Sequence, residues 1–309
     1  MVDPRSATLR PDGGVTGFIG IGNMGLAMAL RLRELGWPVR VRDLDAAREA
    51  EAARHGAQVC ATPAALAAGC ARVVVAVVDA TQSEAVLFGA DGAAAALAPG
   101  SAVLLCPTLA PESTESIAER LGAAGIDCID APMSGGPVRA RDGSMSLMVA
   151  CADAVYERQR GVIGALSSKV FRVGPRAGDG ARTKLVNNLL AAINLAGAAE
   201  ALALAERVGL DPAQTLAVIE QSSGQSWIGS DRLPRALAHD LAPRAHTTLL
   251  AKDAALALAM ARRSGFETRL GEPAAAAFEG ACAAGWSTCD DAALLHFMRG
   301  ASAPPPPGD

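Results

Sequence analysis

Short runs of apolar, often β-branched residues alternate with longer stretches of helical composition through the first half of the chain. The run VVVAVV at 73–78 is apolar throughout, which is typical of a strand buried on both faces of a parallel sheet. Runs of this kind predict strands at 15–20, 38–43, 73–78, 102–106 and 126–132. The alternation therefore predicts an α/β domain with a doubly wound parallel sheet covered by helices.

The pattern changes after Gly174. From Asp179 onward the chain is rich in alanine and leucine at helical spacing and has almost no strand signal. Asp179 is a suitable N-cap for a long helix that runs from Gly180 to about Arg207 and is closed by Gly209. Further helices are predicted at 212–221, 230–239, 247–264 and 272–284. We expect an all-α domain that begins with this long interdomain helix.

A glycine-rich segment, Gly20-Ile-Gly-Asn-Met-Gly25, fits the spacing G-x-G-x-x-G. It follows the first predicted strand, opens a helix, and is accompanied by an acid at the end of the second strand, which is the context of a dinucleotide-binding fingerprint. The first glycine permits a tight turn, the second lets backbone approach a pyrophosphate, and the third lets helix and strand pack closely. The helix N-terminus supplies amide donors for the phosphates. The predicted cofactor-binding residues are Gly20, Gly22, Asn23, Met24, Gly25 and Asp43.

Asp43 is the acid of this fingerprint. Its carboxylate would accept hydrogen bonds from both ribose hydroxyls and repel a 2′-phosphate, and the next residue is Leu44 rather than an arginine. We therefore predict NAD as the cofactor. Arg42 and Arg48 lie nearby in the sequence, so NADP stays open as the alternative.

These patterns divide the chain into four segments. Residues 1–13 are expected to be a flexible N-terminal tail, and 14–177 a Rossmann-type NAD-binding domain. Residues 178–300 are expected to form the all-α domain for substrate binding and oligomerisation, and the proline-rich segment 301–309 a disordered tail.

The composition argues against several classes of binding partner. Lys+Arg total 28 against 32 Asp+Glu, for a net charge of -4, and aromatic residues make up 3% of 309 residues. No basic excess or stacking platform for nucleic acid is evident. No apolar run suggests a membrane span or a signal peptide. The seven cysteines are scattered without a C-x-x-C pair, which argues against a metal site and favours free thiols in the cytoplasm.

Lysine is rare: the 28 basic residues include only Lys169, Lys184 and Lys252. Lys184 lies one turn into the long predicted helix, three and four residues before Asn187 and Asn188, so the three side chains share one stretch of helix surface. Consecutive asparagines are unfavourable inside an apolar helix and indicate a specific role. A partly buried lysine exchanges protons near neutral pH, so Lys184 is the candidate acid/base.

The residues that other classes of dehydrogenase use for hydride transfer are not found in this sequence. The only tyrosine, Tyr156, is followed four residues later by Arg160, so a Tyr-x-x-x-Lys pair is absent. No Cys/His/Glu set is grouped as catalytic zinc requires. The four histidines are interpreted as surface or structural residues, with the role of His246 left open.

Four ordered blocks of the sequence resemble the β-hydroxyacid dehydrogenase family, which includes 3-hydroxyisobutyrate dehydrogenase, tartronate semialdehyde reductase and L-threonate dehydrogenase. GFIGIGNMGLAMALRL (17–32) looks like the cofactor loop, and DAPMSGGPVRARDGSMSLMV (130–149) like the substrate loop. The segment 178–211 looks like the catalytic helix with K-x-x-N-N intact, and LLAKDAALAL (249–258) like the C-terminal Lys-Asp motif. The resemblance covers roughly 15–300.

The resemblance implies roles for single residues. Lys184 matches the acid/base and Asn188 the asparagine that holds the substrate. Ser134, Gly135 and Gly136 match the residues that bind the substrate carboxylate, and a hydroxyl beside unobstructed amides makes a good anion seat. Thr108 and Lys252 match a threonine at the nicotinamide end and a lysine at the substrate–nicotinamide face. Of the family's Asp-x-Ser-Thr before the nicotinamide, residues 105–108 keep only the threonine.

The resemblance implies an NAD(P)-dependent interconversion of a small hydroxy acid and its oxo or semialdehyde form, with a substrate like 3-hydroxyisobutyrate or L-threonate. The stretches 76–89 and 223–240 look closest to the L-threonate branch. Two alternatives stay open, an imine reductase on the same fold and a non-catalytic NAD-binding interaction module, although both tend to lose the lysine that is present here. A homodimer or homotetramer through the helical domain is also expected.

Overall fold

The computed structural model describes residues 11–303. Most of the two predicted tails, residues 1–10 and 304–309, lies outside the described residues. The chain divides into two compact units, Met1–Lys184 and Leu185–Asp309. The division falls inside one continuous helix, α9 (Asp179–Arg207), about two turns after the boundary expected from sequence.

The strands of the first unit form one sheet. Within residues 11–303 the sheet has nine strands in the order β3-β2-β1-β4-β5-β6-β8-β7, and β9 pairs with β8. The strands are β1 (Thr16–Ile19), β2 (Val39–Arg42), β3 (Gln58–Val59), β4 (Arg72–Val75), β5 (Ala102–Leu105), β6 (Asp127–Asp130), β7 (Met133–Ser134), β8 (Ser146–Ala150) and β9 (Lys169–Gly174). All five strands expected from sequence are present, and the fold class is confirmed.

The sheet is parallel from β3 through β6, as expected, but β8 runs antiparallel to β6 and to β7. The sequence pattern did not predict β8, whose segment SLMVA lies inside the substrate-loop block. An apolar run has the same pattern in either direction, so strand direction depends on tertiary packing and is not readable from periodicity.

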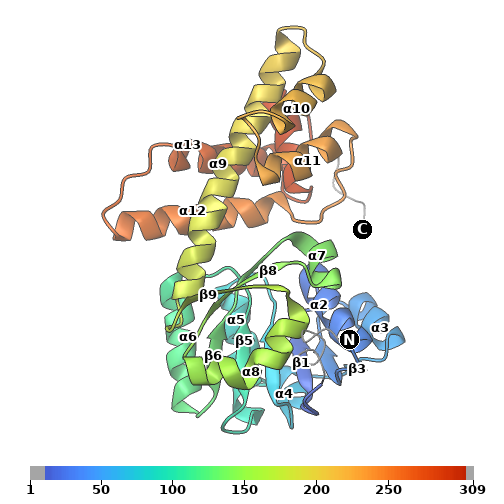
Figure 1. Cartoon of the computed structure of the whole chain (residues 1–309), viewed down its shortest axis with the longest axis vertical. Helices are drawn as coiled ribbons and strands as arrows, with labels where there is room; N and C mark the ends of the chain where they lie inside the picture. Colours follow the sequence, from blue (N-terminus) through green and yellow to red (C-terminus); the bar gives the residue numbers. More distant parts are fainter. Residues whose placement is uncertain (1–10, 304–309) are drawn as a thin grey trace, which may run out of the picture. The chain divides into compact units, whose positions relative to one another are not determined.

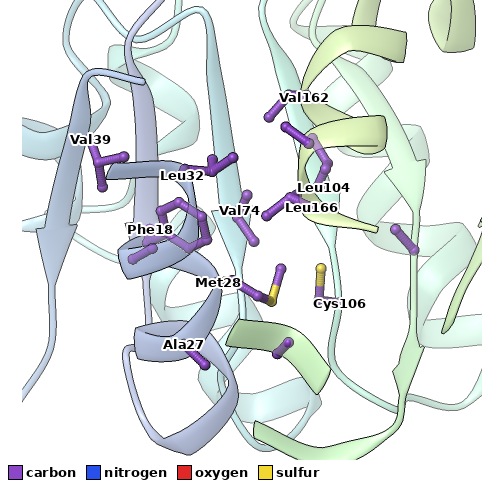
Figure 2. Close-up of a cluster of buried hydrophobic side chains, with 14 of the residues drawn as sticks. Phe18, Ala27, Met28, Leu32, Val39, Val74, Leu104, Cys106, Val162 and Leu166 are labelled. Atoms are coloured by element: carbon purple, nitrogen blue, oxygen red, sulfur yellow. The ribbon is translucent and has the colours of Figure 1, made fainter. Parts of the chain in front are cut away.

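Helices cover both faces of this sheet (Figure 1). They are α2 (Asn23–Glu34), α3 (Ala46–Arg54), α4 (Pro63–Ala67), α5 (Ala80–Phe88), α6 (Pro111–Ala123), α7 (Gly136–Asp142) and α8 (Asp153–Leu166). Alternate strand residues face opposite layers. Phe18, Val74 and Leu104 belong to a buried cluster with α2 and α8 (Figure 2), while their neighbours Val75 and Leu105 pack with α4, α5 and α6. This alternation explains why the strands are apolar on both faces.

The second unit is all helical around the later turns of α9. Its other helices are α10 (Pro212–Glu220), α11 (Trp227–Leu237), α12 (Thr247–Arg263), α13 (Gly271–Ala281) and α14 (Leu294–Met298). Leu195 and Leu202 of α9 are fully buried in a cluster with Leu233, Leu250 and residues of α13. The sequence pattern placed α9, α10 and α12 within one or two residues of their bounds.

Helix α9 is, within residues 11–303, the one helix whose length and hydropathy would suit a membrane span, and 39% of its apolar window is buried. The core helix of a water-soluble protein meets the same criterion. Buried residues of α9 form part of the helical core, so its apolar composition is partly explained by packing.

A matched pair of leucines tests the layered core. Leu104 in β5 is 1% exposed and Leu44 is 94% exposed. We expect Leu104→Ala to lower the free energy of unfolding by about 2–5 kcal/mol, because it removes buried apolar contacts and leaves a cavity. Leu44→Ala should change it by less than about 0.5 kcal/mol. Urea titration followed by circular dichroism measures both, and equal effects would contradict this core assignment.

Candidate functional site

The glycine-rich turn lies between β1 and α2, and its three glycines have different environments. Gly20 has a φ of +84°, and a Cβ there would lie 2.9 Å from the carbonyl of Ala76. A Cβ on Gly25 would lie 2.0 Å from the carbonyl oxygen of Gly20, so the helix packs directly on the turn. At Gly22, by contrast, a Cβ would meet nothing within 4 Å. Two glycines are therefore required by the fold, and the middle one borders open space.

Asp43 follows β2 at the same edge of the sheet and contacts the turn. Its Oδ2 accepts a hydrogen bond from the backbone N–H of Ile21 at 2.5 Å, and its Oδ1 accepts one from the N–H of Asp45 at 2.9 Å. Each carboxylate oxygen keeps a second lone pair for a ribose hydroxyl. The neighbouring Arg42 forms an ion pair with Glu49 at 3.0 Å, and Arg48 donates to the Asn23 side chain at 2.8 Å.

This arrangement fits a dinucleotide. Gly22 is the N-cap residue of α2 and has no side chain, so the first amides of the helix border the open space rather than a capping group. Phosphate oxygens are suitable acceptors for such amides, and the helix dipole favours their negative charge. Asn23 and Met24 begin the helix beside the turn, and Asp43 follows β2 at the position where the dinucleotide fingerprint has its acid.

The segment expected to bind a carboxylate lies after β6. Ser134 ends β7, Gly136 begins α7, and Gly135 and Gly136 have φ values of +129° and +75°. Only glycine adopts both values without strain, so the turn depends on this pair. Thr108 follows β5 and is half-buried. These residues belong to the same unit as the glycine-rich turn and as Lys184.

Lys184 and Asn188 lie one turn apart on α9 and are 7% and 8% exposed. Burial to this degree is unusual for a lysine and requires compensating contacts. The unit boundary falls directly after Lys184, so Asn188 and Lys252 are assigned to the second unit. Lys169, in β9, is exposed.

A chain of hydrogen bonds in the second unit connects the asparagines of α9 with α12. The Asn187 amide donates to Oδ1 of Asn188 at 2.9 Å, and the Asn188 amide donates to Oδ2 of Asp253 at 2.6 Å. Lys252 donates from Nζ to the other oxygen of Asp253 at 2.7 Å. One carboxylate thus orients an amide and an ammonium group that sequence reasoning had assigned separately.

Asp253 is 6% exposed. It is the member of this hydrogen-bonded network that was not predicted from the sequence as a site residue. The signal was present, because an acid in the buried stripe of an apolar helix needs a partner. Periodicity places Asp253 between the buried residues Leu250 and Ala254 of α12, but it does not identify the partner on α9. His246, left open above, is the N-cap residue of α12, and its Nδ1 lies 3.1 Å from the carbonyl oxygen of Thr288.

Comparison with known proteins covers most of the chain. The family described as the NAD binding domain of 6-phosphogluconate dehydrogenase matches residues 15–174. The family described as "NAD-binding of NADP-dependent 3-hydroxyisobutyrate dehydrogenase" matches residues 178–298. The chain therefore carries domains that bind NAD or NADP.

Individual relatives match over nearly their full length. An L-threonate dehydrogenase of Cupriavidus necator is 38% identical over 288 residues, which is 93% of this chain and 97% of the relative. Human mitochondrial 3-hydroxyisobutyrate dehydrogenase is 32% identical over 92% of this chain and 86% of its own length. A crystal structure of a 3-hydroxyisobutyrate dehydrogenase from Salmonella typhimurium superposes with a TM-score of 0.87 at 32% identity, covering 92% and 99% of the two chains.

The different environments of two glycines give a test of the cofactor turn. Gly22→Ala should leave the melting temperature nearly unchanged but weaken NADH binding by about tenfold or more, because the methyl group enters the space that the phosphates need. Gly25→Ala should lower stability by about 1–3 kcal/mol through overpacking against the Gly20 carbonyl. Thermal melts and NADH fluorescence titrations measure both. Unchanged binding in Gly22→Ala would rule out this turn as the phosphate site.

Proposed function

Because this chain belongs to the β-hydroxyacid dehydrogenase family and is an NAD(P)-dependent oxidoreductase, we propose that it oxidises a small hydroxy acid with Lys184 as the acid/base. The single observation that supports this role most strongly is the burial of Lys184 on α9, one turn before Asn188. NAD or NADP, held at the glycine-rich turn and Asp43, would supply the acceptor for the hydride of the carbinol carbon. The chain itself must bind the substrate carboxylate, hold the hydroxyl and remove its proton.

Lys184 supplies the proton acceptor. A neutral lysine amine takes the hydroxyl proton as the hydride leaves, and the ammonium form returns it in the reverse direction. Arginine is abundant in this chain but cannot serve, because it does not give up its proton at working pH. Asn188 holds the substrate in the proposal, and its amide is already oriented by Asp253 at 2.6 Å.

The substrate carboxylate is assigned to Ser134, Gly135 and Gly136. The hydroxyl of Ser134 and amides without obstructing side chains are suitable donors to an anion. Lys252 adds a positive charge toward the substrate or the cofactor, with Asp253 fixing its ammonium group at 2.7 Å. Thr108 is assigned to the nicotinamide end. These assignments support a substrate with one carboxylate and a nearby hydroxyl.

Within this class we propose a substrate like L-threonate, with 3-hydroxyisobutyrate as the second candidate. The support is the 38% identity with an L-threonate dehydrogenase, against 32% with a 3-hydroxyisobutyrate dehydrogenase. Imine reductases share the fold at identities of 17–22%. The buried lysine favours the hydroxy acid reaction over imine reduction and over a non-catalytic binding module.

The proposed reaction is tested with Lys184→Ala on a panel of C3–C6 hydroxy acids. We expect the parent protein to reduce NAD with at least one acid of the panel, and the variant to lose about 10²–10⁴ in kcat because the general base is missing. Nicotinamide absorbance measures turnover, and NADH titration should show unchanged cofactor binding. A parent that is silent across the panel, or a variant with near-parent turnover, would refute the proposal.

We also propose NAD as the preferred cofactor, with Asp43 as the determinant. The carboxylate would accept ribose hydroxyls and repel a 2′-phosphate, and the nearby Arg42 is engaged by Glu49. The ratio of kcat/KM for NAD over NADP should be at least about ten, or about 1.4 kcal/mol. Asp43→Asn should lower this ratio, while Asp45→Asn, a neighbouring capping residue of α3, should leave it unchanged. A parent that prefers NADP would contradict the assignment.

Self-association is proposed through α9. Val186, Leu190 and Leu204 of α9, and Val208 directly after its end, are each more than half exposed, and their spacing puts them on one stripe. Gly197 and Ala201 lie between them on the same stripe and permit close approach of another helix. An exposed apolar stripe of this length suits a second copy of the chain. The protein is proposed to be a homodimer or homotetramer in the cytoplasm, where its seven free thiols would stay reduced.

Light scattering tests the assembly. The parent should have the mass of a dimer or tetramer, and Leu204→Glu should shift it toward the monomer, because a charge in the stripe cannot be buried without a partner. Phe171→Glu, at an exposed apolar residue of β9, is the matched control and should keep the parent mass. A monomeric parent would refute the proposed assembly.

A further inference from the structure

A buried carboxylate stands at the N-terminus of α9. Asp130 is the last residue of β6, is 2% exposed, and is held by backbone pairing with Leu105 of β5 and Ala150 of β8. The carboxylate is therefore anchored in the sheet, at the edge where the other candidate residues of this unit lie.

Asp130 satisfies amides that the helix cannot satisfy itself. Its Oδ2 accepts hydrogen bonds from the N–H of Gly178 at 2.8 Å and of Ala181 at 3.0 Å. The N–H of Gly180 is also directed at the carboxyl group. The first amides of a helix have no partner within the helix, so one carboxylate from β6 replaces the usual local cap.

The approach of helix and carboxylate is close. A Cβ on Gly180 would lie 2.8 Å from both Cγ and Oδ1 of Asp130. Only a glycine lets the backbone come this near. The position of the first turn of α9 is thus set by its contact with the buried carboxyl group of Asp130.

Backbone amides stabilise the charge of this group. Burial raises the pKa of Asp130 to about 6, against the lowering effect of the three amides. The facing charged and titratable groups are Asp179 on α9 and the thiols of Cys106, Cys128 and Cys151, whose pKa values burial raises. At neutral pH the Asp130 carboxyl, with its pKa of about 6, is largely ionised, and it faces the positive end of the helix dipole.

We propose that Asp130 is a positioning residue of the reaction, which fixes the first turn of α9 and thereby sets where Lys184 meets the substrate bound at Ser134–Gly136. Lys184 follows Ala181 by one helical turn, and the Ser134–Gly136 segment follows Asp130 along the chain. The same aspartate therefore contacts the helical turn directly before the base and lies four residues before the carboxylate seat in the sequence. This inference rests on the proposed function of Lys184.

Asparagine is the sharpest replacement. It keeps the size of the side chain but offers one acceptor oxygen and an NH₂ group, which cannot accept from a third amide. It also removes the charge of the Asp130 carboxylate, whose pKa rises from 3.8 to about 6 in the folded state. An acid with a raised pKa lowers stability as pH rises through that range, so at pH 7.5 removal of the charge offsets at least part of the cost of the amide that loses its acceptor.

The test compares Asp130→Asn with Glu115→Gln, parent and Lys184→Ala at pH 7.5. Glu115 forms an exposed ion pair with Arg182 in the same turn of α9, so it is a matched change from acid to amide without contact to the buried group. For Asp130→Asn we expect kcat to fall at least about tenfold, as a small misplacement of a reacting group does, with KM, NADH affinity and melting temperature near the parent values. Glu115→Gln should keep parent kcat.

Gly180→Ala is the second variant, and it decides the outcome if Asp130→Asn does not fold. Alanine favours the helix, yet its methyl group must push the first turn away from Asp130, so kcat should again fall while NADH affinity is kept. Parent-like kcat in the folded variant, or a loss of kcat matched by equal losses of NADH binding and thermal stability, overturns the inference. Near-parent turnover of Lys184→Ala removes the proposed function as well, whereas an inactive Lys184→Ala beside an unimpaired Asp130→Asn removes this inference alone.

Discussion

The first amides of a helix must find hydrogen-bond acceptors outside the helix. In the first unit this requirement explains the structure at the N-termini of two helices, α2 and α9. At α2 the acceptor is left to a ligand, because Gly22 has no side chain and borders open space. At α9 the acceptor is Asp130, buried at the end of β6. The same physical demand therefore leaves amides open for the proposed phosphate site in one place and fixes a helix in the other.

Helix α9 combines several demands in one sequence. Leu195 and Leu202 belong to the buried core of the second unit, and Val186, Leu190, Leu204 and Val208 form the exposed stripe. Lys184 and Asn188 are buried polar exceptions. A helix with apolar residues on two faces leaves little polar surface, so the few polar side chains it retains stand out in both sequence and structure.

Much of the fold could be predicted from sequence because it depends on local patterns. The strands β1, β2, β4, β5 and β6 lie in the predicted apolar or β-branched runs, and the glycine spacing after β1 is specific to a turn that needs a positive φ at Gly20. The direction of β8 was not predictable, because apolar runs are symmetric. The partners of Asp130 and Asp253 were also missed, since each hydrogen bond joins residues distant in sequence, 48 positions apart for Asp130 with Gly178 and 65 for Asn188 with Asp253.

In the proposed reaction Lys184 exchanges a proton and does not merely supply a positive charge. Lys184→Arg separates the two, because arginine keeps the charge and cannot release its proton at working pH. The decisive measurement is kcat of Lys184→Arg beside that of Lys184→Ala on the best hydroxy acid, with NADH affinity as a check on folding. The account predicts that both variants lose turnover to a similar extent. Substantial recovery of kcat in Lys184→Arg would contradict it and would make Lys184 an electrostatic group.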